Sequence, residues 1–109
     1  MEARKIAVVP LQGQEKYTRL LSGEPQTRGM RSGLVQLNPG QEIGAHSTEH
    51  KEEALVLLSG KAEISCAESE SLTIDAPSLV YIPVHTVHNV KNSGKEILRY
   101  VYVVAPVIP

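Results

Sequence analysis

The apolar residues of this chain come in short runs separated by turn-forming residues, and this pattern limits the fold more than any other feature. No stretch keeps the 3.6-residue apolar period of an amphipathic helix. Instead, about nine or ten candidate strands follow one another at a spacing of roughly eight to twelve residues. Phenylalanine and tryptophan are absent, so the core depends on Val, Leu, Ile and four tyrosines, which suits strands. The pattern predicts an all-β sandwich or barrel.

The expected strands share an extended pattern of apolar residues bounded by Gly, Pro or Asn. They are residues 4–11, 17–21, 33–37, 41–45, 54–58, 62–67, 72–74, 79–82, 86–91 and 97–104. The first is expected at a sheet edge, because Pro10 cannot donate a hydrogen bond to a central ladder. We expect a single domain over residues 1–109, since a chain of this length closes around one core.

The distribution of charge and cysteine limits the partners and the compartment of the chain. The formal net charge is -1, and the eleven lysines and arginines are scattered rather than gathered into the stripe that nucleic acids require. The chain has one cysteine, Cys66, and neither an N-terminal apolar leader nor an apolar run long enough to span a membrane. We therefore expect a soluble cytoplasmic protein that binds neither nucleic acid nor membrane.

The residues with metal-ligand chemistry gather in two short segments. All four histidines lie there, His46 and His50 in the first segment and His85 and His88 in the second. Three glutamates accompany the first pair, at positions 49, 52 and 53. Neutral imidazole and carboxylate are ligands that divalent transition metals take, and in an extended chain residues two apart share a face. Side chains from several strands can therefore converge inside a barrel, where an open mouth would make the site catalytic in type rather than structural.

The spacing of these residues resembles the two sequence motifs of the cupin superfamily. The offsets of the first motif are matched by Gly40, His46, Glu53 and Gly60. The second motif is followed by Pro83, His85, His88 and Asn92, although His85 stands where the family usually has glycine. Together the motifs span residues 40–92, about half of the chain. The resemblance implies a small single-domain cupin with an all-β, double-stranded β-helix (jelly roll) barrel, usually dimeric and often holding one divalent metal ion.

The resemblance also implies a ligand set, carried over residue by residue. The matched positions are His46, Glu53 and His88. The family usually has another histidine two residues after the first, and here that position is Thr48. His50 is a candidate fourth ligand if the loop bulges, since strand parity also turns position 50 inward. The implied metal is a divalent transition ion, and mixed His and carboxylate ligands are compatible with Fe, Mn, Ni, Zn or Cu.

For other residues near the motifs, the sequence leaves more than one role open. Glu52 is a register alternative to Glu53, because the family's loop length varies by one residue. Tyr81, Tyr100 and Tyr102 are expected in the core or in a pocket wall. No catalytic residue is assigned from the sequence.

Two functions remain open. One is a mononuclear metal-dependent enzyme, in which the ion binds a small oxygen-bearing substrate and acts as a Lewis acid or activates dioxygen; the resemblance implies dioxygenase, isomerase or decarboxylase chemistry. The alternative is a non-catalytic module that binds a small molecule in the barrel without metal. We also expect a homodimer, paired through residues 6–9 and 97–104. Residues 1–32 are expected to form an N-terminal strand and loop extension that packs on the barrel or on the dimer partner.

Overall fold

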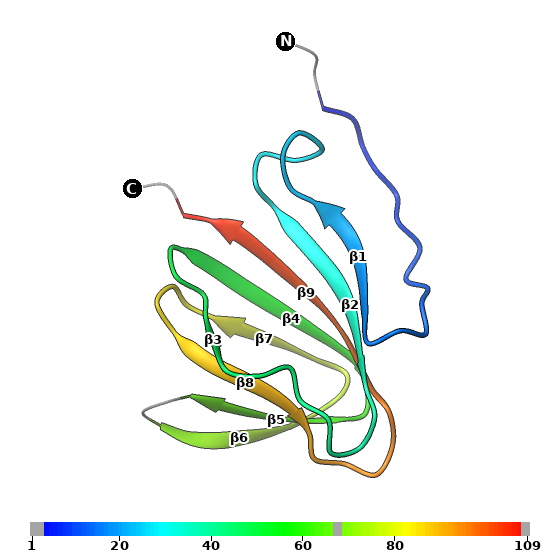
Figure 1. The fold of residues 1–109 in the computed structure, drawn as a ribbon, viewed down its shortest axis with the longest axis vertical. Helices are drawn as coiled ribbons and strands as arrows, with labels where there is room; N and C mark the ends of the chain where they lie inside the picture. The colour runs from blue at the N-terminus through cyan, green and yellow to red at the C-terminus, as the bar shows by residue number, and fades with distance from the viewer. Residues whose placement is uncertain (1–3, 67–68, 108–109) are drawn as a thin grey trace.

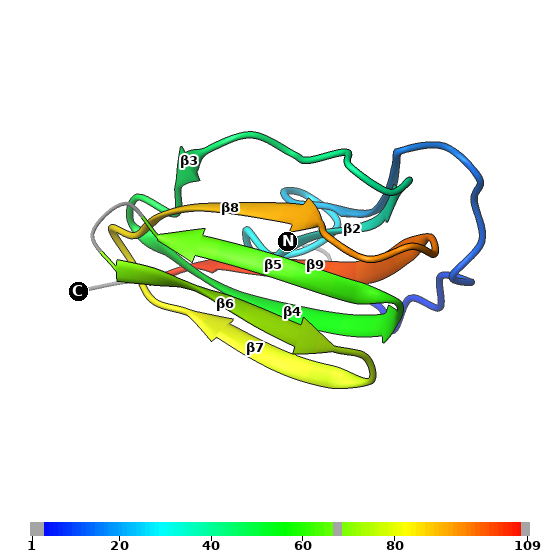
Figure 2. The same ribbon diagram turned by 90° about the horizontal axis from the view of Figure 1, so that it is seen from below.

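The computed structural model describes residues 4–66 and 69–107, which form two antiparallel sheets (Figures 1 and 2). One sheet has five strands in the order β1-β2-β9-β4-β7, and the other has four in the order β3-β8-β5-β6. The strands of the described residues are β1 (Tyr17–Ser22), β2 (Arg31–Leu37), β3 (His46–Ser47), β4 (Lys51–Ser59), β5 (Lys61–Cys66), β6 (Ser69–Asp75), β7 (Ser78–Ile82), β8 (Val87–Asn92) and β9 (Leu98–Pro106). The predicted all-β class is confirmed. Within these ranges, no helix has the length and hydrophobicity needed to cross a membrane.

Strand β4 shows why alternating sequences of this chain form half-buried strands. Glu53, Leu55 and Leu57 are buried, whereas the residues between them are more exposed. This period of two places every second side chain on the inner face of the five-stranded sheet. Because β4 pairs with β7 on one edge and β9 on the other, it is a central strand of this sheet, and its inward side chains are buried. Glu53 is therefore held on the same inward face as two core leucines.

The apolar core and Glu53 lie at different levels of the barrel. The core consists of Val35, Leu37, Leu55, Leu57, Ala62, Ile64, Ile82, Val90, Leu98 and Tyr100. The antiparallel register sets Leu57 opposite Tyr100, near the start of β9, and Glu53 opposite Val104, near its end. Leu57 and Glu53 are four positions apart, which is about 13 Å along the strand. The apolar core thus closes one end of the barrel and leaves the other end for polar side chains.

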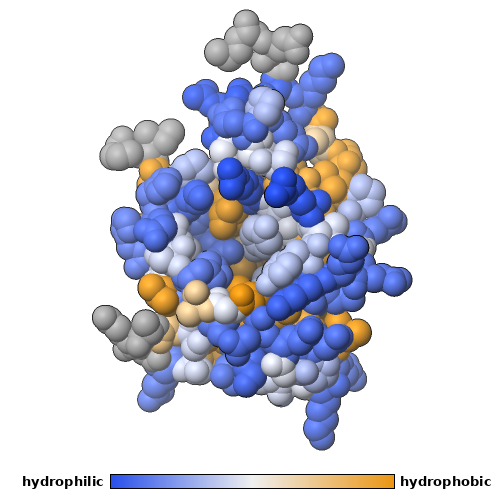
Figure 3. Space-filling view, viewed as in Figure 1, coloured by the Kyte–Doolittle hydropathy of each residue, from blue (hydrophilic) through white to orange (hydrophobic). Residues whose placement is uncertain are grey.

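The molecular surface in the view of Figure 3 is mostly hydrophilic, and its hydrophobic residues appear as separate patches. A face of this kind is ordinary for a folded domain, because scattered apolar residues on a surface need no partner.

The strand predicted for residues 4–11 is wrong, because residues 4–16 form no strand. Figure 1 shows this segment as an extended coil outside β1. Ile6 and Val8 are 97% and 87% exposed, and the segment is tied to the body by an ion pair of 2.7 Å between Arg4 and Glu24. Alternating apolar residues are not sufficient for a strand, which also needs a neighbour to pair its N–H and C=O groups. The shorter strand predicted for residues 17–21 is confirmed as β1, which pairs with β2.

Residues 97–104, predicted to pair across a dimer interface, have no free strand edge for such pairing. Strand β9 lies between β2 and β4 and is hydrogen-bonded along both edges. A strand with two paired edges has no free N–H and C=O groups to offer a second chain. Since residues 6–9 form no strand either, neither of the two predicted segments is a strand with a free edge.

Candidate metal centre

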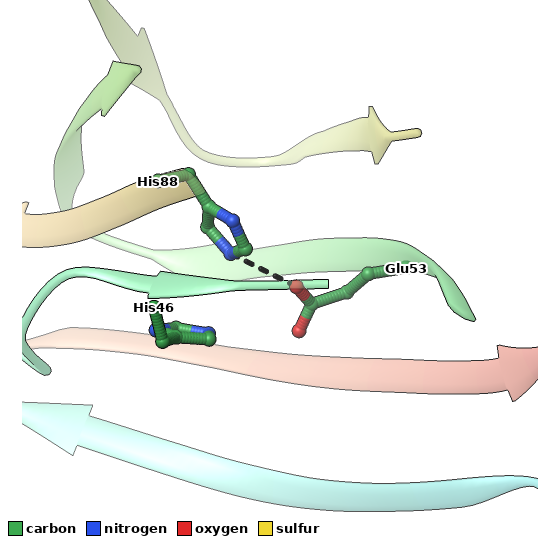
Figure 4. A group of neighbouring side chains, drawn as sticks. All are labelled: His46, Glu53 and His88. Carbon is green, nitrogen blue, oxygen red and sulfur yellow. Dashed lines mark ion pairs between the residues drawn. The ribbon is translucent and has the colours of Figure 1, made fainter. Parts of the chain in front are cut away.

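His46 and His88 come from neighbouring strands and lie directly opposite each other. They are register partners in the antiparallel pair β3–β8. Their ring centroids are 4.4 Å apart, and the ring planes are inclined by 56°. Directly opposite residues of a strand pair share one face of the sheet, so both imidazoles are presented to the same side. Figure 4 shows the two rings close together on the inner side of the barrel.

Each imidazole is oriented by a backbone carbonyl two residues before it. The Nδ1 atom of His46 is 3.0 Å from the carbonyl oxygen of Gly44, and the Nδ1 atom of His88 is 3.1 Å from that of Thr86. A carbonyl oxygen only accepts hydrogen bonds, so in both rings Nδ1 is the donor. In the neutral imidazole this leaves Nε2 with a free lone pair, which is the arrangement found in metal-ligating histidines.

Glu53 brings a carboxylate to these rings from the opposite sheet. Its side chain is buried on β4, and its Oε1 atom lies 3.0 Å from Nε2 of His88. One potential ligand atom from each of His46, Glu53 and His88 lies within 4.8 Å of the other two. Figure 4 shows the carboxylate pointing toward the histidine pair. The cluster therefore joins the two sheets at the polar end of the barrel.

The contact between His88 and Glu53 requires a positive charge. Nε2 of His88 is buried and has no partner with hydrogen-bond geometry among the described residues, although Oε1 of Glu53 is within ion-pair distance. If the imidazole were neutral with its proton on Nδ1, a lone pair would face an anionic oxygen. A proton on Nε2 or a cation shared by the two atoms removes this repulsion. Two imidazole nitrogens and one carboxylate oxygen fit a divalent transition metal, so the residues present suit such an ion.

Glu53 affects the protonation of two neighbouring residues, His88 and Tyr100. Burial lowers the pKa of His88, but the Glu53 carboxylate and the Thr86 carbonyl raise it by more, so that the net shift is upward from 6.5. Burial, followed by the negative charge of Glu53, raises the pKa of Tyr100 far above its usual range. In the absence of a metal ion, His88 therefore holds a proton more readily than a free imidazole, and Tyr100 stays a neutral phenol.

The structure leaves His50 and Glu52 outside the cluster. His50 is exposed in the turn before β4, where its carbonyl accepts a hydrogen bond of 3.0 Å from the N–H of Val107. Glu52 is also exposed, and its carboxylate accepts a hydrogen bond of 2.7 Å from the hydroxyl of Tyr81. Glu53, not Glu52, is the glutamate on the inner face. Tyr81, for which a core or pocket position was predicted, lies 62% exposed.

Thr48, which replaces a histidine of the family motif, has a structural task. Its buried hydroxyl donates a hydrogen bond of 2.7 Å to the Pro83 carbonyl and accepts one of 3.0 Å from the Thr86 N–H. The Thr48 N–H in turn donates to the Thr86 carbonyl at 3.2 Å. This is the carbonyl that orients His88. Thr48 therefore supports a ligand position instead of being one.

His85, the other departure from the family motif, is exposed in the turn before β8 and also lies outside the cluster. Its φ of 52° is in the left-handed region, where glycine is favoured, which is consistent with the glycine usually found there. Its N–H donates a hydrogen bond of 2.7 Å to the Glu49 carbonyl, and this bond joins the turns before β4 and β8.

The cluster opens into a cavity of about 360 Å³. Its lining residues are Tyr17, Val35, Ile43, His46, Ser47, Thr48, Glu49, Lys51, Glu53, Leu55, His88, Val90, Tyr100, Tyr102 and Val104. The wall positions predicted for Tyr100 and Tyr102 are thus confirmed. Lys51 was not predicted, although its place two residues before Glu53 on the same strand would have indicated it. A cavity of this size accommodates a small molecule next to the histidine pair.

These features define a class of protein, namely a β-barrel with a His, His, Glu cluster facing an internal cavity. The family model of the Cupin domain matches residues 33–104, more than half of the chain. The chain belongs to the cupin family.

Two relatives and one solved structure are similar to this chain. The alginate biosynthesis protein AlgA of Pseudomonas putida is 33% identical over 61 residues, covering 56% of this chain and 12% of AlgA. Polyketide synthase CurC of Streptomyces cyaneus is 30% identical over 88 residues, covering 78% of this chain and 56% of CurC. The chain thus spans only part of each of these relatives. An RmlC-like cupin family protein from Methanocaldococcus jannaschii, with 18% identity, has a TM-score of 0.79 over 95% of this chain and 94% of that chain. The predicted double-stranded β-helix is confirmed.

Proposed function

We propose that this chain holds one divalent transition metal ion on His46, Glu53 and His88 and binds a small polar molecule beside it in the barrel. One observation carries the proposal: two imidazoles, each donating its Nδ1 proton to a backbone carbonyl, converge on a buried carboxylate, with one potential ligand atom from each of the three residues within 4.8 Å of the others. Metal-ligating histidines almost always donate their other ring N–H to such an acceptor, which sets the orientation of the ring. His50 is not included in the proposed ligand set.

The bound ion would supply Lewis-acid or dioxygen-activating chemistry of the dioxygenase, isomerase or decarboxylase type. Three protein ligands are the number typical of catalytic metal sites, which keep a position for substrate. The residues of this chain would hold and orient the small molecule. Tyr100 remains a neutral hydrogen-bond donor in the cavity wall, and the apolar side chains of Leu55 and Val90 exclude water from one side.

The second candidate is a non-catalytic module that binds its small molecule without metal. It is favoured by Thr48, which removes one customary ligand, and by the ion pair between His88 and Glu53, which one proton is enough to satisfy. The two candidates differ in one measurable property, the affinity of the cluster for a metal ion.

Titration of chelator-treated protein with cobalt(II), followed by visible absorbance, tests the proposal. We expect saturation at one ion per chain, loss of the signal in His46→Ala, Glu53→Gln and His88→Ala, and retention in His50→Ala. His50→Ala is the matched control, because His50 is a histidine of the same segment that lies outside the cluster. An unchanged titration in His88→Ala would exclude the assigned centre. No binding by the wild type would favour the metal-free module.

We also propose that the chain forms a homodimer, as expected from the family. It is supported by neighbouring apolar residues on the outer face of β4 and β7, where Val56 pairs with Leu79 and lies 38% exposed, against 73% for Leu79. Light scattering after gel filtration tests this proposal. We expect Leu79→Glu to give a monomer and Leu72→Glu, an exposed position on β6, to stay dimeric. A monomeric wild type, or a dimeric Leu79→Glu, would contradict it.

A further inference from the structure

A second recess adjoins the cavity of the metal centre on the side of β1 and β2. It has a volume of about 190 Å³ and is lined by Arg19, Leu21, Ser22, Arg31 and Tyr102. Tyr102 also lines the larger cavity, so the two spaces share this side chain as a wall. Strands β1, β2 and β9 lie next to one another in the five-stranded sheet, as Figure 1 shows.

The strand register aligns Arg31 with Glu53 of the metal centre, across the intervening strand β9. Glu53 is opposite Val104, and Val104 is opposite Arg31. Residues opposite one another share a face, and two strand spacings amount to about 10 Å. Arg31 therefore starts from the same inner face as Glu53, about 10 Å away across β9.

Arg19 is aligned in the same way with another set of cross-strand partners. Arg19 is opposite Gly33, and Gly33 is opposite Tyr102. A Cβ atom on Gly33 would lie 2.6 Å from Cε2 and 2.8 Å from the hydroxyl oxygen of Tyr102. The phenol therefore extends over β2 at the level of Arg19, and only glycine leaves room for it.

The side chain of Arg31 also lies over a glycine, Gly23. A Cβ atom on Gly23 would lie 2.9 Å from Nε of Arg31 and 3.3 Å from its Cγ, so the stem of the arginine runs over this glycine. Gly23 has a φ of 84°, which disfavours any other residue there. Two close approaches to glycine thus shape the recess on the sides of Tyr102 and Arg31.

The charge of the two arginines has no partner within the described residues. Neither Arg19 nor Arg31 forms an ion pair with a carboxylate there, in contrast to Arg4, which pairs with Glu24 at 2.7 Å. A guanidinium presents several N–H donors in a planar fork that matches a carboxylate. Two such groups and a phenol hydroxyl around one recess form a suitable surface for an oxyanion.

We infer that Arg19, Arg31 and Tyr102 bind a carboxylate of a small organic acid whose other end reaches the His46, Glu53 and His88 cluster. The inference rests on the proposed function, because it names the class of molecule that the centre would take. The separation of about 10 Å between the two starting points, shortened by the side chains on both sides, suits an acid with several carbon atoms between its polar ends. Glutarate is a simple probe of this kind, and acetate is its one-ended counterpart.

Isothermal titration calorimetry on nickel-loaded and on chelator-treated protein tests the inference. We expect loaded protein to bind glutarate more tightly than acetate, and Arg19→Gln and Arg31→Gln each to weaken glutarate binding about tenfold or more, since a charge-assisted bidentate contact is lost. Arg28→Gln is the matched control, because Arg28 is an exposed arginine between β1 and β2 that does not line the recess. Nickel content should be equal in all four proteins.

Equal glutarate affinity in Arg19→Gln, Arg31→Gln and Arg28→Gln would overturn the inference, as would failure of both protein forms to bind glutarate. Inorganic phosphate is the second probe. Arginine-dependent binding of phosphate without binding of glutarate would assign the recess to phosphate and would likewise contradict the organic acid. If the wild type retains no nickel but binds glutarate through Arg19 and Arg31, the proposed metal function fails while the anion site stands.

Discussion

His46 and His88 face each other across β3 and β8, and each donates its Nδ1 proton to the carbonyl two residues before it. This hydrogen bond, repeated on two strands, leaves both Nε2 atoms available to a ligand on one side of the barrel. The acceptors are the carbonyls of Gly44 and Thr86, at 3.0 and 3.1 Å. We therefore expect residues that hold these carbonyls to control metal affinity without touching the ion.

Thr48→Val tests this control at His88. The substitution keeps the branched shape but leaves the Pro83 carbonyl and the Thr86 N–H without their side-chain partner. We expect the free energy of unfolding to fall by about 1–3 kcal/mol. Metal affinity should fall by about tenfold or more, because the Thr86 carbonyl orients His88. Urea denaturation and metal titration measure the two effects.

Thr73→Val is the matched control for this substitution, since Thr73 is an exposed threonine on β6 far from the cluster in the sheet order. It should change neither quantity appreciably. Wild-type metal affinity in Thr48→Val would show that Thr86 holds its position without the threonine hydroxyl.

The pH dependence of stability should differ between the metal-free and metal-loaded protein. In the metal-free protein the pKa of His88 is raised above 6.5, since Glu53 and Thr86 outweigh burial. A raised folded-state pKa gives stability that is fully present below about 6.5 and is lost as the pH rises through the raised value. We therefore expect the unfolding free energy of the metal-free protein to decrease with pH above about 6.5.

Glu53→Gln should flatten this decrease, because it removes the charge that holds the proton on His88. Metal-loaded protein should show the opposite trend over the same range, since binding to Nε2 displaces a proton and strengthens as the pH rises. Denaturation curves at several pH values check both statements. Parallel curves for metal-free wild type and Glu53→Gln would contradict the role given to the carboxylate.

His85→Gly should stabilise the protein. His85 has a φ of 52°, which costs a residue with a side chain about 1 kcal/mol relative to glycine. Part of this gain is offset, because glycine adds entropy to the unfolded chain. We expect a net change between zero and about 1 kcal/mol in favour of the folded state.

His50→Gly provides the comparison for His85→Gly. His50 also lies in a turn but is not among the described residues with positive φ, so the same substitution should destabilise the protein by about 0.4–1 kcal/mol. Thermal unfolding of both variants measures the difference. Equal destabilisation by the two substitutions would show that backbone conformation at position 85 carries no strain.

The sequence indicated the cluster mainly through its resemblance to the two cupin motifs. His46, Glu53 and His88 could be found from motif spacing and from alternation, and the structure brings all three together. The sequence favoured Glu53 but left Glu52 as a register alternative, because a slip of one residue reverses the face of a strand. The choice depends on the pairing of β4 with β9, which is a contact between distant parts of the chain.

Other predictions depended on which way a side chain faces or on which strands pair, and the local sequence does not define either. The alternation of side chains along an extended strand predicted that His50 points inward. The chain turns at Glu49, whose φ is 54°, and the alternation does not continue through a turn. The strand predicted at residues 4–11 lacked a neighbour, and the edges of β9 were taken by β2 and β4. Arg19 and Arg31 were not singled out, because their common recess follows from the pairing of β1, β2 and β9.

Gly33→Ala tests whether the ring of Tyr102 lies over Gly33. The added methyl group would lie 2.6–2.9 Å from the phenol ring and hydroxyl, so the ring has to move. We expect a loss of about 1–3 kcal/mol in unfolding free energy. In a Tyr102→Ala background the same substitution should cost clearly less, because the clash is absent. Equal costs in both backgrounds, measured by denaturation, would show that Tyr102 does not lie over Gly33.

Elemental analysis of protein purified without an affinity tag or chelator is the most direct test of the metal centre. We expect close to one transition metal ion per chain in the wild type and in His50→Ala, and almost none in His46→Ala. Protein that contains no metal and takes up none on reconstitution, or a His46→Ala variant with the metal content of the wild type, would contradict this expectation.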